Sequence, residues 1–326
     1  MAKFNRTNTE IAHVYRGTFI HSTQQAAVQI LEDALLGVDT EGKIAFIGKG
    51  TEQDRLCQTF GFNLSEITQL AQHEFFMPGL VDTHIHASQY SYAGTALDMP
   101  LLQWLNTYTF PVESRFKDLE FANRVYTKVV RNIFMFKTKI LTHFENDFGQ
   151  RALVGKVCMD RNNSVKHYKE TSQESQEETC RLCSGVLNVR KVLKHKVRLG
   201  LGTDVAGGYS ASILDAIRRA LESSKVLTIQ DPEYDTLTFE EVFRLATLGG
   251  SQALSLDDQT GNFEVGKDFD ALRVNVAAPG GPIDLIQSEE PKILLEKFLN
   301  LGDDRNIVQV FVAGRKVVPF TDATPE

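Results

Sequence analysis

The chain has 326 residues, of which 42% are hydrophobic and 24% are charged, and its formal net charge is −7. These values are near the averages of globular proteins, so they exclude a wholly disordered or fibrous chain. An acidic chain without a run of about 18 apolar residues also argues against a nucleic-acid binder and a membrane-spanning protein. Only four cysteines occur, and the N-terminal residues lack the apolar core of a secretory signal. We therefore expect a cytoplasmic protein with free thiols.

Strands are predicted near both ends of the chain. Residues 14–20 are rich in β-forming side chains, and residues 42–48 form an apolar run bounded by glycines. Residues 270–276 and 307–312 alternate apolar and polar positions, as strands with one buried face do. Neither end has enough strands to bury a sheet face alone, so we expect both ends to build one β-domain together.

Between these strands the pattern is that of an α/β region. Residues 121–136 and residues 212–221 have the apolar spacing of amphipathic helices. Thr238 and Glu241 fit a capping box at the start of a further helix. The glycines at 249–250 are expected to end that helix.

Two histidines and an aspartate are candidates for a metal site. His84 and His86 are two residues apart, and such residues project from the same face of a strand, so two imidazoles can hold one divalent ion. Residues 197–204 are predicted as a short strand that ends in Asp204, where barrel enzymes keep catalytic groups. Each feature alone also fits a structural role, either exposed strand histidines or a turn. Together they favour a metal site, although 118 residues separate His86 from Asp204.

Four stretches carry longer and more specific strings: HEFFMPGLVDTHIHASQY at 73–90, FGQRALVGKVCMD at 148–160, GLGTDVAGG at 200–208 and FRLATLGGSQAL at 243–254. They resemble the guanine deaminase family, zinc hydrolases of the amidohydrolase superfamily, and the likeness extends over most of the chain. The resemblance implies a (β/α) barrel, a homodimer and hydrolytic deamination of guanine to xanthine and ammonia, a step of guanine catabolism.

The resemblance also implies a role for each matching residue. His84, His86 and Asp204 would hold one zinc ion per subunit, and Asp204 would be catalytic by relaying protons. Contacts with the guanine, among them a bond from Gln89 to the purine, are implied for His86, Ala87, Ser88, Gln89 and Asp204.

The chain departs from the family pattern in its middle region. In the family, the third zinc ligand lies in a histidine–x–x–Glu–Asn string whose glutamate is the acid/base. The fourth ligand lies in an Ala–His–Gly string, and an arginine–phenylalanine pair holds the purine. None of these strings occurs in this sequence, in which Thr179 leads within a few residues to a segment that resembles the helix before Asp204.

Two local groups offer other metal-binding side chains in this region. His143 and Glu145 belong to an HFEN string, which has one residue fewer than the family string and precedes the 148–160 stretch, in the wrong chain order. Cys180 and Cys183 form a lone C-x-x-C, whereas zinc sites of that type have a second pair. We expect neither group to bind metal.

The length of the middle region agrees with a missing internal segment. Positions 78–260 hold 183 residues, whereas a complete (β/α) barrel of eight units takes roughly 250. At about 30 residues per unit, about six of the eight units fit. We expect a β-sandwich-like domain from residues 1–76 and 261–326, and a shortened metal-hydrolase barrel in residues 77–260.

The expected function is zinc-dependent deamination of guanine, with a small purine as the partner and neither nucleic acid nor membrane involved. Bound zinc lowers the pKa of a water molecule toward about 7 and so supplies hydroxide. Loss of a general acid costs typically 10²–10⁴-fold in rate, which makes the missing glutamate important. The alternative is a catalytically impaired, truncated isoform or gene-model product that at most associates with a full-length partner.

Overall fold

The computed structural model describes residues 9–136, 138–139 and 187–319. Its strands are β1 Ile11–His21, β2 Gln29–Asp39, β3 Ile44–Lys49, β4 Ile67–Gln69, β5 Glu74–Pro78, β6 Leu80–Val81, β7 Thr138–Lys139, β8 Ala271–Asn275, β9 Ile307–Val312 and β10 Arg315–Val318. Its α-helices are α1 Gln53–Phe60, α2 Leu101–Trp104, α3 Phe110–Glu113, α4 Leu119–Phe136, α7 Val189–Lys194, α8 Ile213–Gln230, α9 Phe239–Ala246, α10 Leu248–Ala253 and α11 Pro291–Leu301. Shorter helical turns are η1 Gly50–Glu52, η2 Leu64–Glu66, η3 Ala87–Tyr92, η4 Leu105–Thr109, η5 Ser114–Lys117 and η6 Asp304–Asn306.

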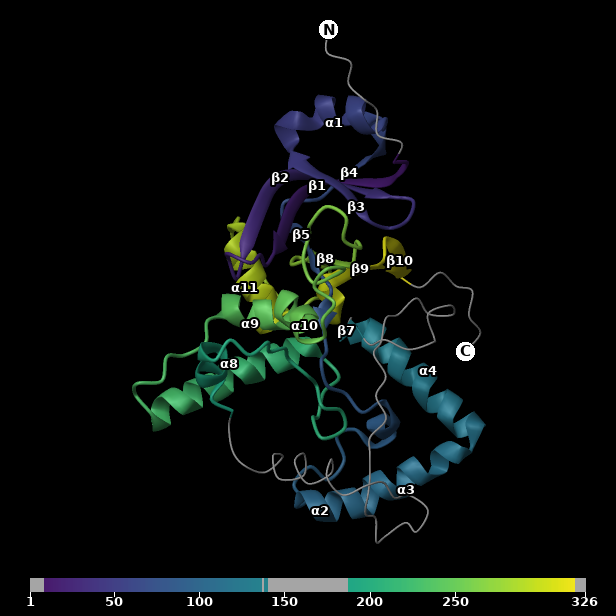
Figure 1. Cartoon of the computed structure of the whole chain (residues 1–326), viewed down its shortest axis with the longest axis vertical. Coiled ribbons are helices and arrows are strands. Elements are labelled where there is room, and N and C mark those ends of the chain that lie inside the picture. The colour runs from purple at the N-terminus through teal and green to yellow at the C-terminus, as the bar shows by residue number, and fades with distance from the viewer. Residues whose placement is uncertain (1–8, 137, 140–186, 320–326) are drawn as a thin grey trace.

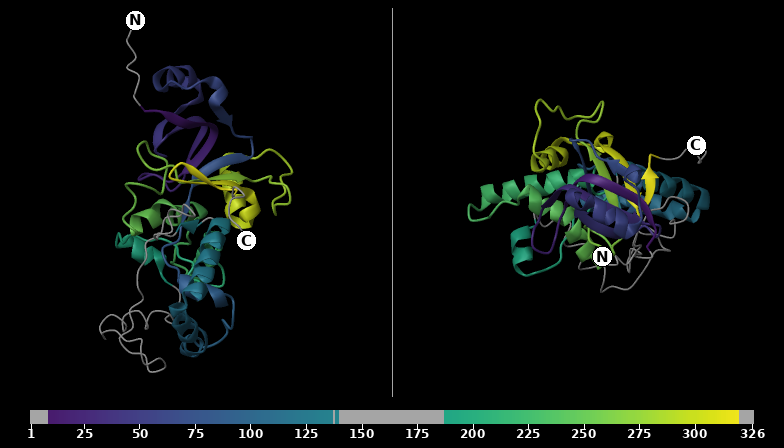
Figure 2. Two further views of the ribbon diagram at one scale, coloured as in Figure 1. Left: turned by 90° about the vertical axis from the view of Figure 1, so that its right-hand side faces the viewer. Right: turned by 90° about the horizontal axis from the view of Figure 1, so that it is seen from above.

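Strands from both ends of the chain share one mixed sheet. Its order is β10-β9-β8-β5-β1-β2-β3, with β4 beside β1. The central pairing is between β5 and β8, which run antiparallel and join the N-terminal strands to the C-terminal ones. Figure 2 shows these two groups of strands lying side by side in both views. The strands predicted near 14–20, 42–48, 270–276 and 307–312 are all present in this sheet.

Strand β5 is buried on both faces. Its successive side chains point alternately to the two faces of the sheet and so enter two separate apolar clusters. Phe75 and Met77 face a cluster formed with helices α8, α9 and α11, whereas Phe76 faces an aromatic cluster on the other side of the sheet. Successive strand residues point to opposite faces, so the run Phe75-Phe76-Met77 serves both layers. A strand covered on both faces explains the continuous apolar run in the sequence.

The aromatic cluster holds the two ends of the chain together. The ring of Phe76 lies 5.5 Å from that of Phe269 and 5.8 Å from that of Phe311, both edge-on. The ring of Tyr15 stacks on Phe269 at 5.6 Å. These rings come from β1, β5, β9 and the segment before β8, and all of them are at least 95% buried. Their packing buries large aromatic surfaces between the N-terminal and C-terminal segments, which are more than 190 residues apart in the sequence.

Helices cover the other face of the sheet, as Figure 1 shows for α8, α9 and α11. Ile213 and Ile217 of α8 and Phe243 of α9 are fully buried in the same cluster as Phe298 of α11. The predicted capping box at the start of α9 is present, with Thr238 accepting the Glu241 N–H and the Glu241 side chain accepting the Thr238 N–H. The helix therefore begins where the sequence indicates.

The expected end of this helix at residues 249–250 is wrong. Helix α9 ends at Ala246, and both glycines lie inside the next helix, α10. The break falls at Thr247, whose backbone leaves the helical region at φ −123° and ψ −99°. A Cβ atom on Gly250 would lie 2.8 Å from the Val81 Cβ, so this glycine permits close packing on β6 rather than ending a helix.

A second group of elements follows the short strand β6, which pairs in parallel with β7. The helices α2, α3 and α4 form an arm away from the large sheet (Figure 1). Phe121, Val125 and Val129 of α4 pack against Ile85 and neighbouring apolar residues of η3. The helix predicted at 121–136 therefore supports the segment that carries the two histidines.

No helix in the described part of the chain is long and apolar enough to cross a membrane. The division into a sandwich-like domain of residues 1–76 and 261–326 and a barrel domain of residues 77–260 stays a prediction. The strand expected around residues 197–204 is not regular, and its bonding is described with the site below.

Candidate metal centre

The three candidate ligands lie on two neighbouring extended segments. One follows β6 and carries His84 and His86, and the other, residues 201–205, carries Asp204. Backbone bonds of 2.8–2.9 Å join them: the Thr83 N–H donates to Leu201, the Asp204 N–H to His84, and the His86 N–H to Val205. Both segments advance in the same direction along these bonds, so they run parallel, and the ligands meet at one end of the pair.

A side chain interrupts this ladder, which is why neither segment forms a full strand here. The buried carboxylate of Asp82 accepts the Thr203 N–H at 3.0 Å, where a regular ladder would use a backbone carbonyl. It also accepts the Thr203 hydroxyl at 2.5 Å and the His84 N–H at 3.1 Å. Burial raises the pKa of Asp82, and the bonds from Thr203 and His84 partly offset this effect. Asp82 thus ties the two ligand-bearing segments together.

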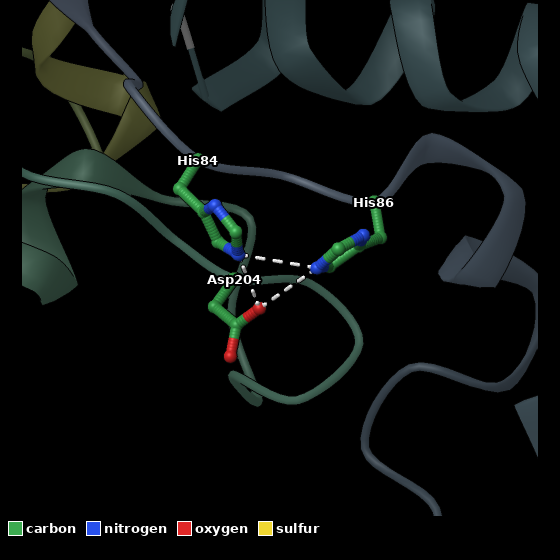
Figure 3. A group of neighbouring side chains, drawn as sticks. All are labelled: His84, His86 and Asp204. Atoms are coloured by element: carbon green, nitrogen blue, oxygen red, sulfur yellow. Dashed lines mark hydrogen bonds and ion pairs between the residues drawn. The ribbon is translucent and has the colours of Figure 1, made fainter. Parts of the chain in front are cut away.

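The donor atoms of the three side chains form a small triangle (Figure 3). The Nε2 atoms of His84 and His86 are 3.1 Å apart, and Oδ1 of Asp204 lies 3.1 Å from the first and 3.3 Å from the second. Within the described residues, these are the three side chains that come together as a candidate metal group. The structure therefore brings the three predicted ligands to one point.

The proton positions within this triangle favour a cation at the site. If His86 donates to the Nε2 of His84, that nitrogen carries no proton and cannot donate to the Asp204 oxygen, so two acceptors face each other there. If both histidines donate to Asp204 instead, their two N–H groups crowd each other. A tetrahedral zinc ion with bonds of about 2.0–2.1 Å holds its donor atoms about 3.3–3.4 Å apart. The observed separations of 3.1–3.3 Å are near that spacing, so the residues fit zinc.

The electrostatics of Asp204 favour its ionised form. Burial opposes ionisation, but hydrogen bonds from His84 and His86 and attraction to both imidazoles outweigh it and hold the pKa well below its usual range. The His84 side chain is 58% exposed, whereas those of His86 and Asp204 are 24% and 35% exposed. The group is therefore open to solvent on the His84 side.

Two local backbone features allow the two segments to approach so closely. A Cβ atom on Gly202 would lie 2.7 Å from the Cβ and 3.0 Å from the backbone nitrogen of His84. Asp204 itself has a φ of +49°, a left-handed conformation that aspartate adopts more readily than most residues. The missing side chain of Gly202 and the left-handed backbone of Asp204 thus allow this segment to lie close to the one that carries the histidines.

The residues expected to contact guanine follow His86 directly. Ala87, Ser88 and Gln89 open the helical turn η3, and the Gln89 N–H donates to the His86 carbonyl at 2.9 Å. Gln89 is 7% exposed, and its side chain bonds to Glu113. The sequence interpretation gave no role to Asp82 or Glu113. Asp82 had a usable signal, since an acid at the end of a buried apolar run needs partners, but Glu113 had none.

The other candidate groups of the middle region lie outside the described residues. These are the HFEN string with His143 and Glu145, the C-x-x-C of Cys180 and Cys183, and the family-like string at 148–160.

Several known proteins are similar to this chain in sequence. A model of the amidohydrolase family matches residues 156–317. Human guanine deaminase is 39% identical over 445 aligned positions, which span 96% of this chain and 98% of that protein. Guanine deaminase from Rattus norvegicus is 40% identical over 446 positions, with the same shares of both chains. Because this chain has 326 residues, at least 119 of the 445 positions have no counterpart in it.

Solved structures of purine deaminases have the same fold as this chain. Guanine deaminase from C. acetobutylicum, with bound guanine in its active site, has a TM-score of 0.76 at 22% identity and covers 93% of this chain and 99% of its own. E. coli guanine deaminase has a TM-score of 0.74 at 23% identity, covering 94% and 99%. An adenosine deaminase from Xanthomonas campestris with bound zinc has a TM-score of 0.73 at 18% identity, covering 95% and 93%.

These structural likenesses give the fold, and the sequence identity of about 40% over nearly the whole of the mammalian relatives gives the family. With a family-like string at the candidate ligands as well, the chain belongs to the guanine deaminases of the amidohydrolase family.

Proposed function

We propose that this chain binds one zinc ion per subunit through His84, His86 and Asp204 and hydrolyses guanine to xanthine and ammonia. The observation that carries the proposal is the triangle of donor atoms with edges of 3.1–3.3 Å, whose residues lie in two of the family-like strings. Two histidines and a carboxylate are a common set in catalytic zinc sites, which keep three protein ligands and leave a position for water.

Bound zinc would supply an activated water molecule at neutral pH. The residues of the chain have separate tasks around it. His84 and His86 would hold the ion through Nε2, and Asp204 through Oδ1, with the other Asp204 oxygen free to take up a proton in the reaction. His86, Ala87, Ser88 and Gln89 would line the purine side, since they continue directly from the second histidine.

The family glutamate that protonates the purine ring has no counterpart in this sequence. We therefore propose a deaminase with a rate at least about 10²-fold below that of a family member that keeps the histidine–x–x–Glu–Asn string, the lower end of a general-acid contribution. At least 119 alignment positions without a counterpart support this expectation. The second candidate, a truncated and impaired relative that at most associates with a full-length partner, is not favoured, because the match spans nearly the whole length of the guanine deaminases.

The missing positions support a shortened barrel in residues 77–260, and the 183 residues at positions 78–260 leave room for about six units there. Beside it we propose a sandwich-like domain from residues 1–76 and 261–326. From the family resemblance we further propose a homodimer that works in the cytoplasm in guanine catabolism.

Zinc content of the purified chain tests the proposed site. After dialysis against zinc, the wild type should retain about one ion per chain by elemental analysis. His84→Ala and Asp204→Asn should retain at most a tenth of that, because loss of one of three ligands weakens binding strongly. His195→Ala is the matched control, since this exposed histidine lies just after α7 and is not part of the triangle, so it should leave the zinc content unchanged. Equal zinc in the wild type and His84→Ala would refute the site.

A further inference from the structure

We propose that Glu113 is a positioning residue that sets which way round the side-chain amide of Gln89 meets the purine. The inference rests on the proposed function, since it assumes that Gln89 contacts guanine. It assigns to the end of α3 a task in purine recognition that the sequence strings did not indicate.

One carboxylate oxygen holds two neighbouring side chains. Oε1 of Glu113 accepts the Ser88 hydroxyl at 3.1 Å and the Gln89 Nε2 at 3.3 Å. Both donors lie in η3, whereas Glu113 ends α3, some 24 residues later in the chain. The contact therefore fixes two purine-side residues against a separate helical element.

The carboxylate decides the orientation of the amide. An ionised carboxylate has acceptors alone. If the Gln89 amide turned by 180°, its own oxygen would face Oε1 of Glu113, and two acceptors would repel each other. A lone glutamine has no such preference, because its oxygen and nitrogen are nearly equal in size. Glu113 thus selects one of two arrangements of equal shape.

The arrangement of the Gln89 amide that Glu113 selects is complementary to one particular pattern of hydrogen-bonding groups on a purine. With one Nε2 hydrogen used by Glu113, Gln89 keeps a carbonyl oxygen and a second N–H to offer. Such a pair matches a purine edge that has an N–H beside a ring nitrogen acceptor, and the turned amide matches the reverse order. Guanine has such an edge in N9–H and N3. Wrong orientation would lose both bonds, so fixing it raises guanine affinity without a direct contact from Glu113.

The position of Gln89 makes this support effective. Its side chain is 7% exposed, and its N–H donates to the carbonyl of the proposed zinc ligand His86. Glu113 lies where α3 passes directly into η5, so its backbone is helical on both sides. A buried amide fixed at both its backbone and its Nε2 has little freedom, which is what positioning in a binding site requires.

Calorimetric titration of the full chain with guanine, zinc being supplied, tests the inference. Glu113→Ala should weaken guanine binding by at least about 2-fold, because a glutamine without a preferred arrangement offers the matching one only half of the time. Gln89→Ala should weaken it at least as much. In the Gln89→Ala background, Glu113→Ala should have no further effect, because its action passes through that amide. Glu120→Ala, which removes an exposed glutamate of α4, is the matched control and should bind guanine like the wild type.

A nuclear magnetic resonance readout separates positioning from folding. The side-chain amide protons of Gln89 should exchange with solvent faster in Glu113→Ala, while the backbone amides of η3 keep their protection. If Glu113→Ala does not fold, Glu113→Gln decides: it keeps the size, removes the charge and should also bind guanine more weakly than the wild type.

Each contrary outcome is distinct. Unchanged guanine affinity in the folded Glu113 variant would overturn the positioning role alone. An equal loss in the wild-type and Gln89→Ala backgrounds would do the same, since Glu113 would then act elsewhere. Absence of guanine binding by the wild type would overturn this inference together with the proposed function.

Discussion

At the scale of single residues, the candidate site depends on Asp82 as much as on its three ligands. The Asp82 carboxylate takes two bonds from Thr203 and one from the His84 backbone, so it sets the distance between the segments that carry His84 and Asp204. Groups that orient metal ligands typically contribute 10–100-fold to metal affinity. Asp82 would thus act on a bound metal through the two segments that it joins.

Asp82→Ala tests this dependence. We expect zinc affinity to fall by about 10–100-fold. The free energy of unfolding should fall by about 2–4 kcal/mol, because the Thr203 N–H and hydroxyl lose a buried acceptor. Thr203→Val removes one of the three bonds and should have a smaller effect on both quantities. Zinc titration and urea unfolding measure them. An Asp82→Ala chain with wild-type zinc affinity would show that the ligand segments position themselves.

The three candidate ligands were predictable from the sequence, whereas the partners of the supporting residues Asp82 and Glu113 were not. The two-residue spacing of His84 and His86 and the acid ending an apolar run at Asp204 are local signals, and the family resemblance strengthened them. The roles of Asp82 and Glu113 depend on partners at Thr203, Ser88 and Gln89. Such pairings arise when the fold closes, and a single sequence has no period or spacing that indicates them.

At the scale of the elements, the junction of β5 and β8 holds the two ends of the chain in one sheet. It contains a nearly buried ion pair in which Arg273 Nη2 lies 2.6 Å from Glu74 Oε2, with side chains 17% and 9% exposed. Breaking a buried pair is strongly destabilising, since one charge is left without its partner. Among the described residues, Arg273 also donates from Nη1 to Gln309 Oε1 at 3.4 Å, and its Nε has no partner, so Glu74 is the carboxylate that balances its charge.

Glu74→Ala should therefore lower the free energy of unfolding by about 3 kcal/mol. Adding Arg273→Met to this variant should recover part of the loss, because the uncompensated charge is removed. Glu120→Ala in α4 breaks an exposed pair at 3.8 Å and should change stability by less than about 1 kcal/mol. Denaturant unfolding of the four chains measures these values. No recovery in the double variant would show that Glu74 contributes through other contacts.

The end of β1 contains a pH-sensitive element. His21 is 4% exposed, and its Nδ1 accepts the Phe263 N–H at 3.2 Å. Burial lowers the pKa of His21 to about 4, against the opposing charge of Glu264. The unfolded chain, with a pKa of about 6.5, binds this proton more readily than the folded one. Stability from His21 is thus complete above pH 6.5, decreases as the pH falls, and is lost below about pH 4.

The expected loss between pH 7 and pH 4 is about 3 kcal/mol from this histidine, at 1.36 kcal/mol per pKa unit. His21→Gln has no ionisable group there and should lose less stability over the same interval by about that amount. Urea unfolding at several pH values compares the two chains, and His195→Gln serves as the exposed control. Parallel pH profiles of the wild type and His21→Gln would contradict the assignment.

The elements themselves were largely predictable. The alternating or continuous apolar runs became β1, β3, β8 and β9, and the capping box marked the start of α9. The glycines at 249–250 gave a wrong helix end, because their role is close packing on Val81, a contact between segments nearly 170 residues apart. Local rules succeed where the cause is local and fail where a distant segment sets the requirement.

At the scale of the whole molecule, the chain joins its two ends in one sheet and is shorter than the guanine deaminases that it matches. The aromatic cluster and the β5–β8 junction account for the association of the two chain ends. At least 119 aligned positions of human guanine deaminase have no counterpart here. The string to which the resemblance assigns the family glutamate does not occur in this sequence. The family membership and the expected low rate are therefore consistent with each other.

Ammonia release from guanine, measured with and without zinc for the wild type and His84→Ala, tests the central claim most directly. We predict slow, zinc-dependent release by the wild type, at least about 10²-fold below a family member with the intact glutamate string, and none above background for His84→Ala. Release that is independent of zinc or persists in His84→Ala would contradict the proposed site, as would a complete absence of release by a zinc-loaded wild type. Release at the full family rate would mean that another residue replaces the glutamate.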